Sequence, residues 1–161
     1  MTMPHLFRRH AGRSRRGQSL VEFALIIPIF ILVVMGIFDL GRGVYAFNTA
    51  NNAAREAARL AIVDQTLTHI QTAGVDHAPA LGLTANDVTV DFRSQSTPST
   101  PNSCTTLSIG CLATVRVNYS FQAATPILGS ILGTIAIAGE SQFPVEAVCV
   151  EPTQPQCPKG N

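Results

Sequence analysis

The hydrophobic positions follow different periods along the chain, and the first stretch has no period at all. Sixteen consecutive residues between Glu22 and Asp39 carry no charge, and most are Ile, Leu, Val or Phe. With the uncharged residues on either side the stretch reaches about 20 residues, which crosses the roughly 30 Å hydrocarbon core of a bilayer. We therefore expect a transmembrane helix over about residues 20–40, kinked rather than ended by Pro28.

After Asp39 the pattern becomes amphipathic without a stop signal. Apolar and small residues recur every three or four positions from Leu40 to Ala61, and polar residues fill the other faces. The run AAREAARLA at residues 53–61 has high helix propensity. A single helix is thus predicted over residues 18–63, about 65 Å long. Because it exceeds the bilayer thickness, its second half must pack against something outside the membrane.

The following segment, residues 64–148, is predicted to form an extracytoplasmic α+β head. Residues 66–80 carry a modest helical stripe that Thr66 or Thr68 could cap. Strict alternation predicts strands at 87–93 and 113–121, and a third, continuous or broken, is expected within 134–148. Residues 94–103 read as a loop and 126–133 as one or two helical turns. The predicted fold is a long N-terminal helix packed against a short helix and a three- to four-stranded antiparallel sheet.

Charge is distributed unevenly along the chain. Residues 1–17 hold five of the eleven Lys and Arg residues and no acid, so the rest of the chain is net negative. A basic segment before an apolar span is typically retained in the cytoplasm. Residues 1–17 are therefore interpreted as a disordered cytoplasmic leader, and everything after Leu40 as exported. A basic tail can also bind nucleic acid, but its place beside the span favours orientation, and no nucleic-acid partner is predicted.

All four cysteines lie in the part predicted to be exported. An even number in an oxidising compartment indicates two disulfides, with three possible connectivities. We favour the local pairs Cys104–Cys111 and Cys149–Cys157, because residues that allow tight loops flank each. The spacings lack the short turn typical of structural zinc sites. Residues 149–161 form a Pro-rich tail that we expect to be loosely ordered except at Cys157.

The sequence offers little for catalysis. It contains no G-x-S-x-G, G-x-x-x-x-G-K, H-E-x-x-H or C-x-x-C motif. Only His69 and His77 could serve an exported site, and both are interpreted as solvated surface residues although Asp76 adjoins His77. We predict that the protein is not an enzyme and has no cofactor or metal.

The junction before the span is more distinctive. Arg15-Arg16-Gly17 precedes Gln18, with Glu22 fifth and Phe23 sixth after the glycine. This arrangement resembles the prepilin-peptidase processing site of type IV pilins in its Flp form. The resemblance implies cleavage after Gly17 and pairing of Glu22 with the free terminal amine of a neighbouring subunit. A carboxylate in apolar surroundings needs such a cation or must be neutralised. Alternatively, Glu22 snorkels to the cytoplasmic headgroups.

The resemblance continues along the predicted helix. The segments GQSLVEFALIIP (17–28), DLGR (39–42) and NNAAREAAR (51–59) resemble the TadE/TadG-like family of pilin-like components of the tight-adherence (Tad, Flp) pilus system. The resemblance implies a minor pilin or pseudopilin, a structural component of Flp (type IVc) pilus assembly and tight adherence. Its partners would be other Tad subunits, contacted through the helix, and the prepilin peptidase. It does not separate the TadE, TadF and TadG subtypes.

The implied location is the bacterial inner membrane, crossed once, with the N-terminus cytoplasmic, the head periplasmic and possible incorporation into an extracellular pilus. Two other hypotheses fit parts of the sequence. One is a generic membrane-anchored extracytoplasmic binding protein with no filament role. The other is a secreted protein whose apolar stretch is a cleaved signal. The stretch is longer than the usual signal core, and the best cleavage site, Val44-Tyr45-Ala46, lies inside a helical pattern.

Overall fold

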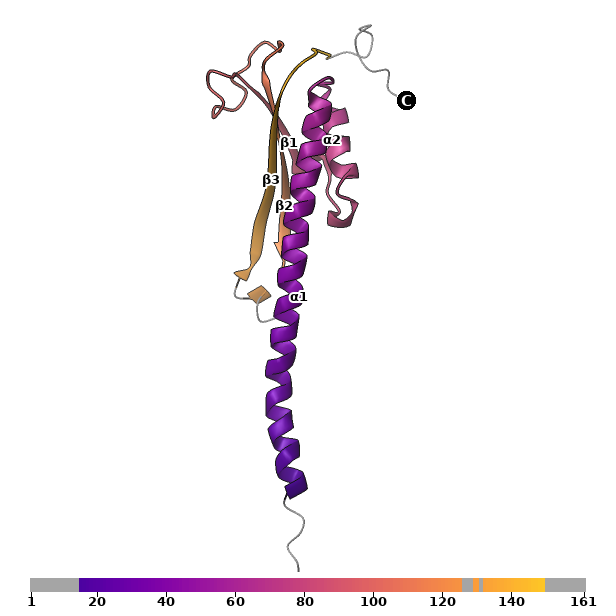
Figure 1. Cartoon of the computed structure of the whole chain (residues 1–161), viewed down its shortest axis with the longest axis vertical. Helices are drawn as coiled ribbons and strands as arrows, with labels where there is room; N and C mark the ends of the chain where they lie inside the picture. Colours follow the sequence, from indigo (N-terminus) through magenta and orange to yellow (C-terminus); the bar gives the residue numbers. More distant parts are fainter. Residues whose placement is uncertain (1–14, 126–128, 131, 150–161) are drawn as a thin grey trace, which may run out of the picture.

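One long helix sets the length of the molecule (Figure 1). The computed structural model describes residues 15–125, 129–130 and 132–149. Helix α1, Arg15–Ala61, spans 47 residues and is helical through Pro28. The predicted long helix is confirmed, although it begins three residues earlier and ends two earlier than expected. The leader up to residue 14 and the tail from residue 150 lie outside the described residues.

A three-stranded antiparallel sheet runs beside the second half of α1. Its strands are β1 (Val88–Arg93), β2 (Leu112–Gln122) and β3 (Thr134–Pro144), in the order β1-β2-β3. Strands β2 and β3 pair along their whole length, from Leu112 opposite Pro144 to Gln122 opposite Thr134. The shorter β1 pairs only with residues 112–117 of β2. The expected alternating strands and the antiparallel sheet are confirmed.

A second helix, α2 (Leu67–Asp76), packs beside α1 and β1. It is shorter than the predicted 66–80 because Pro79 lacks an N–H and disfavours helical geometry in the residue before it. A short 3-10 turn, Pro79–Leu81, follows instead. Thr66 makes no side-chain cap bond. The Thr66 N–H instead donates to Oδ1 of Asp64 at 2.9 Å.

The core lies where the alanine face of α1 meets the sheet and α2. This face, which we call the alanine stripe, is fully buried and comprises Ala50, Ala53, Ala54, Ala57, Ala58 and Ala61. Small side chains allow the backbones to approach closely. At Gly139 of β3, an added Cβ would collide with the backbone of Ala50 and Asn51. At Gly74 of α2, an added Cβ would lie 3.1 Å from a methyl group of Val88.

The segment after β3 closes the far end of α1. A helix leaves its last carbonyl groups without partners inside the helix. Here the carbonyl of Ile62, just past α1, accepts the N–H groups of Glu146 and Ala147 at 3.0 and 3.2 Å. The buried Gln65 side chain donates to the Ala147 carbonyl at 2.8 Å and accepts the Cys149 N–H at 2.6 Å. These hydrogen bonds therefore hold the segment after β3 against the C-terminal end of α1.

Candidate functional site

The residues predicted to form the processing junction lie on the half of α1 that extends beyond the head (Figure 1). Gly17, Gln18, Glu22 and Phe23 are all helical and exposed. A Cβ added at Gly17 would meet nothing within 4 Å among the described atoms. The structure therefore leaves this segment accessible to other molecules, while the roles of these four residues remain predictions.

The same half of α1 exposes large apolar side chains on all its faces. Twelve of them are more than half exposed: Leu20, Val21, Phe23, Leu25, Ile26, Ile29, Phe30, Ile31, Val33, Ile37, Phe38 and Leu40. Burying a side chain of this kind is worth about 1.5–3 kcal/mol, so the segment favours an apolar environment. Among the described helices, only α1 is long and apolar enough to cross a membrane. The helix therefore has the properties of a single membrane span.

Asp39 joins the end of this apolar segment to the head. The residue is only 6 % exposed. Its two carboxylate oxygens accept the N–H groups of Ala124 and Thr125 at 2.8 and 2.9 Å. Arg42 Nη1 lies 3.4 Å from Oδ1 of Asp39, and its guanidinium group stands 5.5 Å from the ring centroid of Phe121. We call the described residues of the connection below β2 and β3 (123–125, 129–130 and 132–133) the foot of the hairpin.

This role of Asp39 was missed in the sequence, where the residue ended the uncharged stretch and formed part of the DLGR segment of the family resemblance. The bond partners lie 85 and 86 residues further along the chain, and no local pattern reports such a distance. One signal was present, because Arg42 follows Asp39 by three residues and lies on the same helix face.

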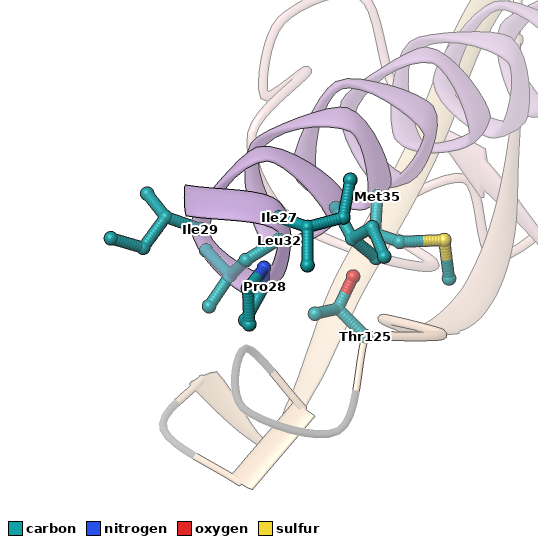
Figure 2. A pocket seen from close by; sticks show the side chains of 7 residues that line it. Ile27, Pro28, Ile29, Leu32, Met35 and Thr125 are labelled. Atoms are coloured by element: carbon teal, nitrogen blue, oxygen red, sulfur yellow. The ribbon is translucent and has the colours of Figure 1, made fainter. Parts of the chain in front are cut away.

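Two apolar hollows flank the foot. The first is lined by Thr125 and by α1 residues that include Pro28, Leu32 and Met35, and Figure 2 shows Thr125 facing them. The second lies between α1 and the lower ends of β2 and β3, and we call it the foot groove. Its larger apolar side chains are Leu40, Val44, Phe47, Phe121, Leu132, Ile135 and Ile137. Such linings suit apolar chains rather than polar ligands.

The predicted disulfide Cys104–Cys111 is present and closes the loop before β2, with the two Cα atoms 6.1 Å apart. Cys149 is buried and disulfide-bonded. Cys157, its predicted partner, lies outside the described residues, so that pairing remains a prediction.

The two histidines of the head are only partly as expected. His69 is half exposed but is not simply solvated, because its Nδ1 lies 2.7 Å from Oδ2 of Asp64. Burial raises the pKa of Asp64, but the hydrogen bonds from His69 and Thr66 outweigh it and leave that pKa below its ordinary value. His77 Nδ1 lies 2.8 Å from the Ala73 carbonyl. Within the described residues, no three His, Cys, Asp or Glu side chains are grouped as they would be to hold a metal ion.

Comparison with known proteins adds one finding. Neither the curated proteins nor the solved structures give a match. The family model described as TadE-like protein matches residues 17–59. The match lies entirely within α1 and includes the junction, the apolar segment, Asp39 and most of the alanine stripe. The resemblance noted in the sequence is thereby confirmed over this segment: the long helix is similar to TadE-like proteins, and this similarity points to an association with the Tad pilus.

Proposed function

We propose that the protein is a minor pilin or pseudopilin, a structural and non-enzymatic component of Flp (type IVc) pilus assembly. The observation that carries this proposal is the coincidence of the TadE-like match with α1. The helix has two different halves. The half beyond the head exposes its apolar side chains, and the other half holds the head through the alanine stripe. This division leaves a whole helical segment available to membrane and neighbouring subunits.

The orientation follows from charge. Five arginines precede the span, so the N-terminus stays in the cytoplasm and the head is periplasmic. Prepilin peptidase then cleaves after Gly17, which makes Gln18 the new terminus. Glu22 is exposed, so its carboxylate is free to meet the terminal amine of an adjacent subunit. In an apolar bundle this pairing would offset the cost of a buried charge.

The first test is the mass and N-terminal sequence of the protein purified from membranes of its native host. A terminus at Gln18 supports processing and the amine partner for Glu22. A terminus at Met1 or Thr2 would make the protein an uncleaved anchor and remove the Glu22 mechanism. A terminus near Phe47 would mean secretion, and the pilus function would be wrong.

A second test separates a filament role from a generic membrane-anchored binding protein. Glu22→Ala should abolish pilus assembly while the protein remains inserted in the membrane. Glu146→Ala is the matched control, because it removes an exposed carboxylate from the head and should leave pili normal. Normal pili in the Glu22→Ala strain would contradict the proposal and favour the alternative.

A further inference from the structure

The lower part of the β2–β3 hairpin has no charged side chain. From residue 117 to residue 139 the sequence contains no Asp, Glu, Lys, Arg or His. The first charges beyond this stretch, Arg116 and Glu140, are register partners across the two strands. A designed soluble protein is given about 25–35 % charged residues on its surface. Yet Leu132 and Ile135 in this stretch are 54 % and 41 % exposed, so its composition suits an apolar environment.

The foot lies at the level of the apolar segment of α1 and not above it. Thr125 lines a hollow with side chains from Ile27 to Met35 (Figure 2). A span of about 20 residues that ends at Leu40 includes all of these positions. Met35 lies four residues, or about 6 Å, before Asp39 along the helix. If α1 crosses the bilayer, the foot must therefore enter it or its interface.

Four backbone donors of the foot are paired in a way that fits this position. An unpaired N–H group in lipid costs several kcal/mol, so backbone at membrane depth needs internal acceptors. Asp39 accepts the N–H groups of Ala124 and Thr125. Gly129 donates to the Thr125 carbonyl at 2.8 Å, and Gly133 donates to the Gly129 carbonyl at 3.0 Å. Arg42, beside Asp39, supplies the opposite charge and is long enough to reach the headgroups.

We propose that the foot of the hairpin is embedded in the membrane interface on the head's side, and that lipid acyl chains fill the foot groove. This inference rests on α1 spanning the membrane, as the proposed function requires. The groove is continuous along α1 with the apolar segment, because Gly36, Asp39 and Leu40 at the end of that segment also line the groove. Its rim is formed by large side chains such as Val44, Phe47 and Leu132. Closely packed membrane helices prefer small residues at their contacts, so this rim suits lipid better than a second copy of the helix.

Tryptophan fluorescence can test the depth of the foot, because the chain has no tryptophan of its own. The full chain would be reconstituted in phosphatidylcholine–phosphatidylglycerol vesicles as one of three single-tryptophan variants. Leu132→Trp reports the foot, Val33→Trp reports the span, and Ile109→Trp reports the disulfide-closed loop at the opposite end of the head. Ile135→Trp is the substitute if Leu132→Trp does not fold.

Lipids brominated on their acyl chains should quench Leu132→Trp and Val33→Trp several-fold more strongly than Ile109→Trp. If Val33→Trp is quenched but Leu132→Trp and Ile135→Trp respond as weakly as Ile109→Trp, the foot lies outside the membrane and this inference is wrong while the anchor stands. If Leu132→Trp, or its substitute Ile135→Trp, is shielded from aqueous iodide but not quenched by brominated lipid, another protein copy fills the groove, which also overturns the inference. Absence of quenching at Val33→Trp would instead refute the membrane span on which both proposals depend.

Discussion

Substituting Gly139 by alanine tests the contact between helix and sheet. Gly139 lies against the backbone of Ala50 and Asn51, and an added Cβ would come closer to those atoms than real Cβ atoms do. The neighbouring atoms belong to the main chain of a long helix, so no side chain can rotate away. The alanine stripe must therefore move off the sheet, and a gap of about 0.5–1 Å already forfeits a quarter to a half of each dispersion contact.

The expected magnitude follows from two opposing effects. Overpacking a core costs about 1–3 kcal/mol, and a rigid backbone neighbour places this site near the upper value. Replacing glycine by alanine lowers the conformational entropy of the unfolded chain, which by itself stabilises the folded protein by about 0.4–1 kcal/mol. We expect Gly139→Ala to lower the free energy of unfolding by about 2 kcal/mol, which for a domain of about 100 residues corresponds to a Tm lower by about 8–16 °C.

Differential scanning calorimetry of the full chain in detergent micelles measures this change. Gly41→Ala is the matched control, since the same substitution there lies in a helix with open space around it. It should leave stability unchanged or raise it by up to about 1 kcal/mol. A Gly139→Ala protein that melts at or above the wild-type temperature would refute the close contact between α1 and β3.

Three further predictions concern the far end of the head. The pKa of Asp64 lies below its ordinary 3.8, so the stabilisation by its carboxylate is complete above that pH and is lost as the pH falls through the folded pKa. Asp64→Asn should therefore reduce the fall of the melting temperature at acid pH. An unchanged fall would contradict this prediction. Replacing Cys104 and Cys111 by serine opens a short loop and should lower the free energy of unfolding by about 2–3 kcal/mol. Urea unfolding measures this change, and equal midpoints for the oxidised wild type and the double variant would contradict the prediction. Gln65→Ala leaves the Ala147 carbonyl and the Cys149 N–H unpaired and should lower the free energy of unfolding by about 1–3 kcal/mol. The segment after β3 should then be cleaved faster by proteases. An unchanged cleavage rate would contradict the role of Gln65 in holding this segment.

Much of the architecture could be predicted because it depends on the spacing of apolar and small residues along the sequence. The four-residue spacing of Ala50, Ala54 and Ala58 predicted a helix with one packed face, and that face is buried. Alternation predicted the strands at 87–93 and 113–121, and the alternate side chains Val115 and Val117 of the second one are buried. The exposed apolar half of α1 likewise followed from hydropathy alone.

What could not be predicted depends on partners distant in the chain. Asp39 bonds to backbone groups whose own identity leaves no trace in the sequence, since any residue supplies an N–H. Gln65 similarly reaches 82 and 84 residues along the chain. The glycine at 139 resembles any strand glycine until the helix is placed against it. The predicted roles of Gly17 and Glu22 depend on a peptidase and a neighbouring subunit, which a single folded chain does not contain.

The direction of the alanine stripe has a mechanical consequence. The stripe and the β2–β3 ladder both run along the long axis of the molecule (Figure 1). Tension applied along α1 would load these contacts in shear, so that many must break together, whereas a force across the axis would peel them apart one after another. Because forced unfolding is governed by the rate of unfolding, the two directions should differ in the force they withstand. The protein is therefore mechanically anisotropic, strong against tension along α1 and weak against a force that lifts the hairpin from it.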